Sequence, residues 1–321
     1  MADVPPVTPT GYLVYYHHAM RGFAEQFIEA GKEKGRNFCK KEITWSKFEG
    51  GMPNIFIHDI EQARSRHILF FGSFTSYEEM SFQLDVIYVF TRSLVASLTV
   101  VLPYWPVGTM ERVIKEGEVA TADIWAWHFS KLPLTAGGPT RVIVYDVHAL
   151  PNRFFFHDGA IVSLLSGVPL LIAELEKEKA KNGTEIAIAF PDAGACKRFG
   201  TMFPGFELIT CEKVRDGNTR IVRIAEGNPS GKICVIVDDL VRSGGTLLEC
   251  RGGLLKAGAV GVSAYCTHAD FDQGKRITRF LEEKSFDNFY LTDSNPQVTN
   301  LINGKGPFKI LSLAASLVDY V

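Results

Sequence analysis

The strongest constraint on the fold is a regular alternation of short, apolar, β-branched runs with amphipathic segments of helical length. This alternation predicts βαβ units, in which helices cover mainly parallel sheets. Residues 234–237 and 98–102 are almost continuously apolar, as strands buried on both faces are. The expected strands are Tyr12–Tyr16, His67–Phe71, Ser97–Leu102, Arg141–Tyr145, Glu185–Phe190, Ile233–Val237, Val262–Cys266 and Asn288–Leu291. The expected helices are Met20–Gly31, Tyr77–Ser93, Gly159–Ala180 and Thr246–Ala257. The fold class is therefore predicted to be α/β.

Two stretches of the chain repeat the same order of elements. Residues 69–104 and 233–268 each run from a strand through a polar turn and a long helix to a second strand. A chain of 321 residues is long enough for two domains that each bury a core. Pro151 and Asn152 interrupt the pattern, so the boundary between two similar halves is expected near residues 148–158.

Composition excludes several classes of protein. The chain is 46% hydrophobic and 22% charged with a net charge of -2, so it lacks the basic excess that nucleic-acid binding requires. The most apolar stretch, residues 93–104, is too short to cross a membrane. The first residues carry neither the basic nor the apolar region of a secretory signal. Six singly spaced cysteines predict reduced thiols in a cytoplasmic protein.

One strand-to-helix turn carries the residues most suggestive of ligand binding. The apolar run 234–237 ends in two adjacent carboxylates, Asp238 and Asp239, and a glycine-rich loop follows before the next expected helix. Ligands of open parallel sheets bind at such turns. Glycines let successive N–H groups point into one concavity, and the helix adds its positive end, which suits a phosphate. Paired carboxylates suit vicinal hydroxyls, directly or through a hydrated divalent cation. The loop therefore predicts a site for a sugar phosphate with a diol, at Asp238, Asp239, Arg242, Ser243, Gly244, Gly245 and Thr246.

The alternative is a polar βα loop that only caps a helix. A pair of glycines alone would favour that interpretation. The uninterrupted succession of apolar strand, paired Asp, Ser-Gly-Gly-Thr and helix argues against it, because burying part of an acidic pair without a purpose is costly.

The segment Cys234-Val-Ile-Val-Asp-Asp-Leu-Val-Arg-Ser-Gly-Gly-Thr246 resembles the phosphoribosyl-diphosphate binding motif. Type I phosphoribosyltransferases and ribose-phosphate diphosphokinases share this motif. The resemblance implies that the acidic pair holds the ribose hydroxyls and that the Ser-Gly-Gly-Thr loop holds the 5-phosphate.

Three further segments resemble the diphosphokinases in particular: Val144-Tyr-Asp-Val-His148-Ala-Leu, Phe190-Pro-Asp-Ala-Gly-Ala-Cys-Lys-Arg198 and Glu212-Lys-Val-Arg215. The resemblance implies that His148 and Asp192 serve Mg2+ and the nucleotide phosphates, and that Lys213 and Arg215 close over the ATP phosphates. Without their neighbours, His148 could cap a strand end, and the basic stretch could be a solvated hairpin.

The resemblance covers nearly the whole chain and is strongest to the plant-type, phosphate-independent class, in phrases such as 108–112, 117–122 and 221–227. It implies two domains similar to type I phosphoribosyltransferases. Residues 1–150 would form the nucleotide side with oligomer contacts. Residues 151–305 would carry the ribose 5-phosphate loop, and residues 306–321 would return to the first domain. At least a homodimer is expected, because the family places adenine at a subunit boundary.

The sequence departs from the family pattern around the nucleotide. Thr109 and Met110 stand where bacterial-type enzymes have an Arg-Gln pair that holds ATP, and Arg112 is the candidate replacement. Phe48 corresponds to the Phe that stacks on adenine in the family. The alternative interpretation is that Phe48 is a buried core aromatic. Two polar neighbours of that Phe are replaced here by Gly50 and Met52. The phosphate loop has Arg242 where Asp or Thr is usual.

The implied reaction converts ATP and ribose 5-phosphate into phosphoribosyl diphosphate and AMP, with Mg2+ as cofactor. Two alternatives remain open: a phosphoribosyltransferase, and a catalytically silent regulatory homologue, which the lost ATP contacts would also fit. The retained site residues favour the active enzyme; they are His148, Asp192, Lys213, Arg215, Asp238 and Asp239.

Overall fold

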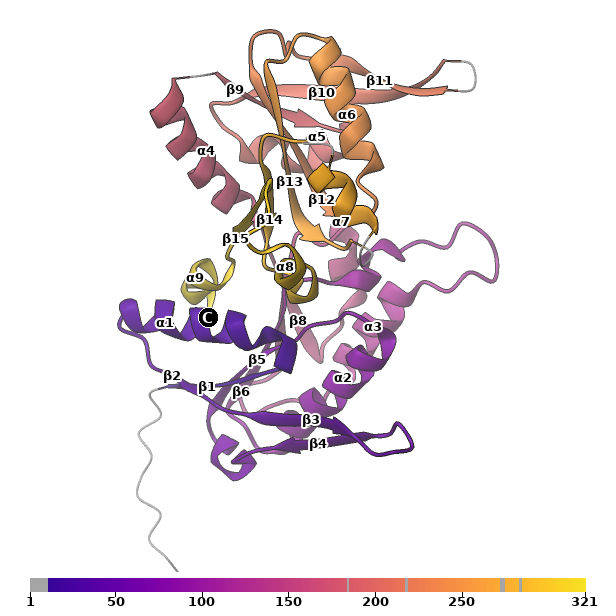
Figure 1. The fold of residues 1–321 in the computed structure, drawn as a ribbon. Coiled ribbons are helices and arrows are strands. Elements are labelled where there is room, and N and C mark those ends of the chain that lie inside the picture. The colour runs from indigo at the N-terminus through magenta and orange to yellow at the C-terminus, as the bar shows by residue number, and fades with distance from the viewer. Residues whose placement is uncertain (1–10, 184, 217–218, 272–274, 283–284) are drawn as a thin grey trace, which may run out of the picture. The chain divides into compact units, whose positions relative to one another are not determined.

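The computed structural model describes residues 11–321 except 184, 217–218, 272–274 and 283–284 (Figure 1). The chain divides into two compact units. Residues up to 165, together with 314–321, form the first unit, and residues 166–313 form the second. The sequence predicted that the first domain would end at residue 150 and the second at residue 305. Strand β15 (Phe308–Leu311) belongs to the sheet of the second unit, and the short helix α9 (Ala314–Leu317) belongs to the first.

The first unit contains a six-stranded sheet in the order β2-β1-β5-β6-β7-β8, and every neighbouring pair is parallel. Its strands are β1 (Tyr12–Tyr16), β2 (Phe38–Lys40), β5 (His67–Phe71), β6 (Ser97–Leu102), β7 (Thr140–Tyr145) and β8 (Ala160–Leu165). Two further strands, β3 (Ile43–Lys47) and β4 (Pro53–Ile57), pair as a separate antiparallel hairpin. Its longer helices are α1 (Arg21–Glu33), α2 (Tyr77–Arg92) and α3 (Thr121–Ser130).

Helices cover both faces of the first sheet. Alternate strand residues such as Phe70 pack with Phe90 of α2 and Phe129 of α3 in one apolar cluster. On the opposite face, Phe71 contacts Phe23 and Phe27 of α1 through edge-on ring packing. This two-sided burial explains why the strands are almost continuously apolar.

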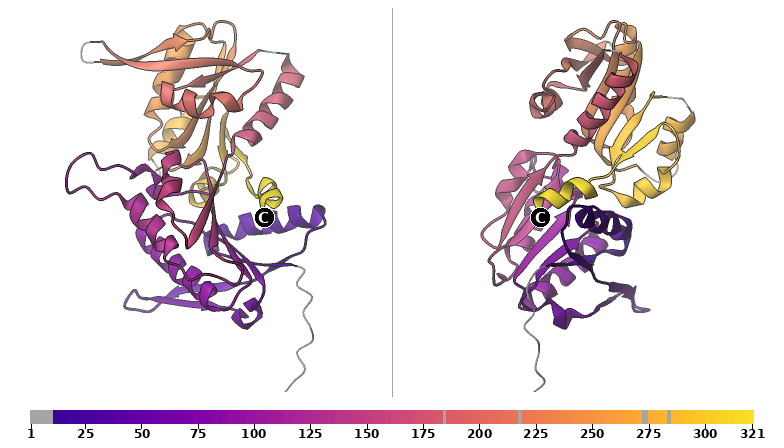
Figure 2. Two further views of the ribbon diagram at one scale, coloured as in Figure 1. Left: turned by 180° about the vertical axis from the view of Figure 1, so that it is seen from behind. Right: turned by 90° about the vertical axis from the view of Figure 1, so that its left-hand side faces the viewer.

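The second unit contains a seven-stranded sheet in the order β11-β10-β9-β12-β13-β14-β15. The strands are parallel except for the antiparallel pair β10–β11. Its strands besides β15 are β9 (Ile186–Phe190), β10 (Glu207–Asp216), β11 (Thr219–Glu226), β12 (Ile233–Val241), β13 (Gly261–Ala269) and β14 (Phe289–Thr292). The hairpin β10–β11 extends outward from its unit, as Figure 1 and the left view of Figure 2 show.

Helices also cover both faces of the second sheet. One apolar cluster joins the sheet to α6 (Gly245–Lys256), α7 (Lys275–Glu282) and α8 (Pro296–Ile302). The other cluster joins it to α4 (Val168–Asn182) and α5 (Ala193–Phe199). The sequence repeat is therefore real in structure: β2-β1-β5-β6-β7 of the first sheet has the same order as β10-β9-β12-β13-β14 of the second.

One predicted helix is wrong in part. Residues 159–180 were expected to be a single helix, but the structure has strand β8 (Ala160–Leu165) followed by α4. Residues 161–165, which are apolar except for Ser163, continue the sheet beside β7, and Pro169 occupies the first turn of α4, where its missing N–H costs nothing. No helix in the described part of the chain is long and apolar enough to span a membrane.

Candidate functional site

The acidic pair and Asp192 lie at the same edge of the second sheet. Strands β9 and β12 are parallel neighbours, with Ala189 opposite Ile236. Asp192 comes three residues after Ala189, and Asp238 comes two residues after Ile236. The ends of adjacent parallel strands meet at one edge, where ligands of open α/β sheets bind. The Asp192 charge is close enough to contribute to the raised pKa of Asp238.

The two carboxylates of the pair have different surroundings. Asp239 is buried, and its Oδ2 lies 3.6 Å from Nη1 of Arg198 on α5. Asp238 accepts a hydrogen bond from the backbone N of Asp239 at 2.9 Å. Burial, with the Asp239 charge beside it, raises the pKa of Asp238 to about 8. Burial and the neighbouring carboxylate therefore favour the protonated form of Asp238.

The glycine loop surrounds a cavity of about 160 Å³, a size suited to a phosphate group. Gly244 has a φ of +71°, and a Cβ at this position would lie 2.0 Å from Cζ of Phe280. Only glycine fits this conformation and this contact. Helix α6 starts at the next residue, so its first N–H groups face the loop. The cavity is lined by Asp238, Leu240, Val241, Arg242, Ser243, Gly244, Thr246 and Leu247.

Arg242 lines this cavity and also contacts the next strand's loop. Its Nε lies 3.1 Å from Oδ2 of Asp270, which follows β13. Both side chains are partly exposed, so the ion pair contributes little to stability. In this pair the Arg242 side chain lies at the rim of the loop, beside Asp270.

Asp192 is the N-cap of α5. Its Oδ1 accepts a hydrogen bond from the N of Ala195 at 2.9 Å, and the side chain remains exposed. No group of three or more ligating side chains forms a metal site among the described residues. An exposed carboxylate still fits a Mg2+ site, because this ion commonly binds one or two carboxylates and takes its other ligands from substrate phosphates.

The two predicted catalytic cations lie on the hairpin β10–β11. The backbone of Lys213 pairs with Val222, and the backbone of Arg215 pairs with Arg220. The backbone in this segment is therefore a paired hairpin. The side chains of Lys213 and Arg215 lie outside the described part of the structure.

The predicted nucleotide residues belong to the first unit, whereas the predicted sugar-phosphate loop belongs to the second. His148 follows β7 and is exposed. Arg112 is exposed, and its Nε contacts Oε1 of Glu111 at 3.0 Å. Phe48 lies at the turn between β3 and β4 and is 58% exposed, so the alternative of a buried core aromatic is wrong.

The sites where the sequence departs from the family pattern are also at the surface. Met110 is 51% exposed, next to Thr109 at the end of a 3-10 turn. Gly50 and Met52 flank the exposed turn of the β3–β4 hairpin. These positions are therefore not required by the core of the first unit.

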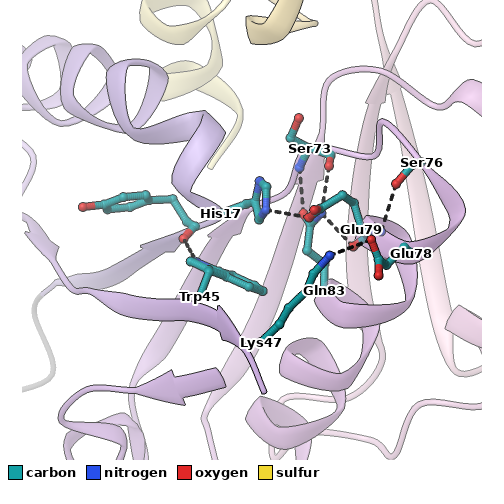
Figure 3. Close-up of polar contacts among 9 residues, drawn as sticks. His17, Trp45, Lys47, Ser73, Ser76, Glu78, Glu79 and Gln83 are labelled. Carbon is teal, nitrogen blue, oxygen red and sulfur yellow. Dashed lines mark hydrogen bonds and ion pairs between the residues drawn. The ribbon is translucent and has the colours of Figure 1, made fainter. Parts of the chain in front are cut away.

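The first unit has a polar cluster at the equivalent edge of its own sheet (Figure 3). His17 follows β1 and is buried, with its Nε2 2.9 Å from Oε2 of Glu79. Burial, with His18 beside it, lowers the pKa of His17 to about 3. The side-chain amide of Gln83 donates to the O of Ser73 and accepts from its N, at 2.7 and 2.8 Å. The β5–α2 turn is thus held by the protein's own side chains, and it lacks the acidic pair and the paired glycines of the second unit.

Two features of the site were not singled out from sequence. The contact between Arg198 and Asp239 joins two residues that lie 41 positions apart in the chain, so no local pattern reveals it. The only sequence signal for Arg198 was its place in the Pro-Asp-Ala-Gly-x-x-Lys-Arg segment. The cluster of His17, Glu79 and Gln83 had no signal of that kind.

Comparison with known proteins supports the geometry of the second unit. The model of the phosphoribosyl transferase domain matches residues 166–290. The chain is 45% identical to ribose-phosphate pyrophosphokinase 4 of Oryza sativa over 285 residues, 87% of each protein. It is 43% identical to the mitochondrial ribose-phosphate pyrophosphokinase 3 of Spinacia oleracea, over 86% of this chain and 69% of that protein. The crystal structure of phosphoribosylpyrophosphate synthetase from Mycobacterium smegmatis is similar over 97% of both chains, with a TM-score of 0.77 and 20% sequence identity.

Proposed function

Because this chain belongs to the ribose-phosphate pyrophosphokinase family, we propose that it transfers the diphosphoryl group of Mg-ATP to O1 of ribose 5-phosphate. The products would be phosphoribosyl diphosphate and AMP. The observation that carries the proposal is the pairing of an acidic strand end with a glycine loop around one phosphate-sized cavity. Resemblance of the remaining site segments to diphosphokinases separates this proposal from a phosphoribosyltransferase.

The sugar phosphate would bind across the end of β12. The 5-phosphate would accept hydrogen bonds from the loop Ser243–Thr246 and from the first N–H groups of α6. The ribose hydroxyls would meet Asp238, whose pKa is raised by burial, and Asp239, which contacts Arg198. Arg242 would add positive charge at the rim of the cavity.

The proposed chemical step is attack of the ribose O1 on the β-phosphorus of ATP. The bond from this phosphorus to the α-phosphate oxygen breaks, and AMP leaves. Lys213 and Arg215 would stabilise the charge that develops on the transferring group. Mg2+, when bound with ATP, would neutralise phosphate oxygens, with His148 and Asp192 as the residues that serve it.

The nucleotide would be held by residues of the first unit. Phe48 presents an exposed ring that could stack on adenine, and Arg112 is an exposed cation near Thr109 and Met110. The family's use of a subunit boundary for adenine leads us to propose a homodimer or a larger homo-oligomer.

The finer class and the compartment are also proposals. The similar pyrophosphokinases from rice and spinach are plant proteins, which supports the plant-type, phosphate-independent class. A cytoplasmic location is supported by six free cysteines. The spinach relative is named as mitochondrial, so relatives occupy more than one compartment.

One assay separates the candidate activities. The protein is incubated with Mg-ATP and ribose 5-phosphate, and the nucleotides are resolved by chromatography with and without inorganic phosphate. AMP that accumulates in step with phosphoribosyl diphosphate, independently of phosphate, supports the proposal. Formation of ADP rejects it. Binding of both substrates without turnover indicates a silent regulatory homologue, and consumption of phosphoribosyl diphosphate with a free base indicates a phosphoribosyltransferase.

A further inference from the structure

We infer that Arg198 is a positioning residue for the sugar-phosphate site: its guanidinium selects Asp239 as the charged, fixed member of the acidic pair. Asp238 is thereby left as the member that can donate a hydrogen bond. This inference rests on the proposed binding of ribose 5-phosphate at the two carboxylates. It adds a residue from helix α5 to a site otherwise built from β12 and its loop.

The contact itself is unusual within the described part of the molecule. Nη1 of Arg198 lies 3.6 Å from Oδ2 of Asp239, and their side chains are 16% and 9% exposed. Every other described pair between an arginine or lysine and a carboxylate has at least one side chain that is more than 25% exposed. Water and salt screen those exposed pairs, whereas a buried pair is screened much less.

Packing fixes the direction of the Arg198 side chain. Its guanidinium carbon lies 4.6 Å from the ring centre of Phe199, and that ring is buried in the core of the unit. Helix α5 is itself anchored at its start by the Asp192 cap. A planar guanidinium held against a ring loses little freedom when it meets a carboxylate. Arg198 is therefore preorganised to face the end of β12.

The acidic pair needs such a partner. Two adjacent carboxylates at a buried strand end repel each other, and burial favours the protonated form of both. Arg198 supplies a cation to the pair, and it reaches Asp239. The charge is therefore placed on Asp239, and the raised pKa of Asp238 agrees with that division. A vicinal diol then meets one strong acceptor and one group able to donate.

A purely structural ion pair is the alternative, in which Arg198 only anchors α5 to the sheet. The two roles predict different measurements. A structural role would lower the melting temperature and affect both substrates alike. A positioning role would weaken sugar-phosphate binding selectively and change its dependence on pH.

The test uses the full-length protein with three variants. Arg198→Met removes the charge, Arg198→Lys keeps it on a shorter stem, and Lys197→Met removes the exposed neighbouring cation of the same helix as a matched control. The affinity for ribose 5-phosphate is measured by calorimetry without nucleotide between pH 6 and 9. The KM of each substrate and the melting temperature are measured in parallel.

We expect Arg198→Met to weaken ribose 5-phosphate binding about 30-fold or more, the usual cost of breaking a buried charge pair. The pH at which the affinity for ribose 5-phosphate changes should be higher in this variant than in the wild type. Arg198→Lys should restore part of the affinity, Lys197→Met should leave it unchanged, and the KM for ATP should change less than about 3-fold.

Wild-type affinity for the sugar phosphate in Arg198→Met, or an equal loss for both substrates, overturns the inference while leaving the proposed function intact. A wild-type protein that binds no ribose 5-phosphate removes the proposed function and this inference together. Because Arg198→Lys keeps the charge, it reports on the role even if Arg198→Met does not fold.

Discussion

Gly244 connects the phosphate loop to helix α6 with a φ of +71°, and it packs directly against Phe280. Gly244→Ala adds a methyl group in an unfavourable backbone region and 2.0 Å from Cζ of that ring. We expect a loss of stability of about 2 kcal/mol or more, together with loss of measurable ribose 5-phosphate binding. Urea unfolding and calorimetry measure the two effects.

Gly252 provides the control for that substitution, because it lies inside the same helix with nothing within 4 Å of its Cβ position. Gly252→Ala should stabilise the protein by roughly 0.5–1 kcal/mol and leave sugar-phosphate binding unchanged. If Gly244→Ala behaved like Gly252→Ala, the steric account of the loop would be wrong.

Asp293 titrates near neutrality because burial raises its pKa to about 6, although it accepts hydrogen bonds from Ser312 Oγ and the N of Leu313. The folded pKa lies above the unfolded value of 3.8, so the folded state binds the proton more tightly. This group's contribution to stability therefore falls as the pH rises from about 4 to about 6. Above that range the folded protein has lost up to roughly 3 kcal/mol of stability through this group, because its folded and unfolded pKa values differ by about two units.

Asp293→Asn removes this titration. We expect the free energy of unfolding of the variant, relative to wild type, to rise between pH 4 and pH 7.5, as measured by urea unfolding. Asp158→Asn, which removes an exposed carboxylate, should show no such trend. A constant difference between Asp293→Asn and wild type across this range would mean that Asp293 is not the titrating group.

At the scale of elements, the hairpin β10–β11 carries the cations proposed for catalysis. Lys213→Ala removes one charge from the proposed transfer step. We expect kcat to fall about 10²–10³-fold or more, with the affinity for ribose 5-phosphate unchanged. Lys181→Ala, an exposed lysine on α4, is the control for loss of charge. Full activity of Lys213→Ala would remove this lysine from the mechanism.

The hairpin β3–β4 presents Phe48 at its turn and Phe56 on its second strand, 58% and 61% exposed. Stacking of a base on an aromatic ring contributes about 1–3 kcal/mol, so Phe48→Ala should raise the KM for ATP about 5-fold to 150-fold. Phe56→Ala, on the same hairpin, should leave it unchanged. Equal effects of both substitutions would indicate that the hairpin supports the fold rather than the adenine.

Elements buried on both sides were predictable from sequence, and exposed ones were not. Strands β1, β5 and β6 were placed at their observed limits, because a continuous apolar run bounded by turns leaves little choice. The strands that were missed include the hairpin strands β3 and β10, which mix polar and apolar residues and lie partly in solvent. Strand β8 was merged with α4, since a short apolar run before a helix has no distinguishing period.

The candidate site was predictable only where its residues are close in sequence. The Asp238–Thr246 loop is one contiguous segment, so its composition already implied a sugar phosphate. The contact of Arg198 with Asp239 depends on how α5 packs on the sheet, and the split in charge between the two carboxylates depends on burial. Neither property can be inferred from a local sequence pattern.

At the scale of the whole molecule, one strand order is used twice with different turns at its ligand edge. In the second unit the β12–α6 turn carries glycines and surrounds a cavity. In the first unit the corresponding β5–α2 turn is held by Gln83 through two hydrogen bonds to Ser73. The repeated sheet thus carries a glycine loop around a cavity in one copy, and in the other a turn whose polar groups bond within the protein.

The chain end also belongs to this larger organisation, because residues 314–321 are part of the first unit although the preceding strand β15 lies in the second sheet. Cationic side chains contact a carboxylate and two backbone carbonyl groups near the C-terminus. Nζ of Lys34 reaches Asp319 at 2.7 Å, Arg36 donates to the O of Val318 at 2.5 Å, and Arg141 donates to the O of Tyr320 at 2.6 Å. Cations at the end of a helix satisfy its last carbonyls.

Leu317 tests whether this segment stabilises the first unit. Its side chain is fully buried, so Leu317→Ala should cost about 2–5 kcal/mol, whereas Leu301→Ala, at a position 40% exposed on α8, should cost less than about 1 kcal/mol. Amide hydrogen exchange should show lost protection in α1, which α9 contacts, while β12 of the second unit keeps its protection. Equal loss of protection in α1 and β12 would show instead that the two units unfold as one, and that the chain end stabilises both.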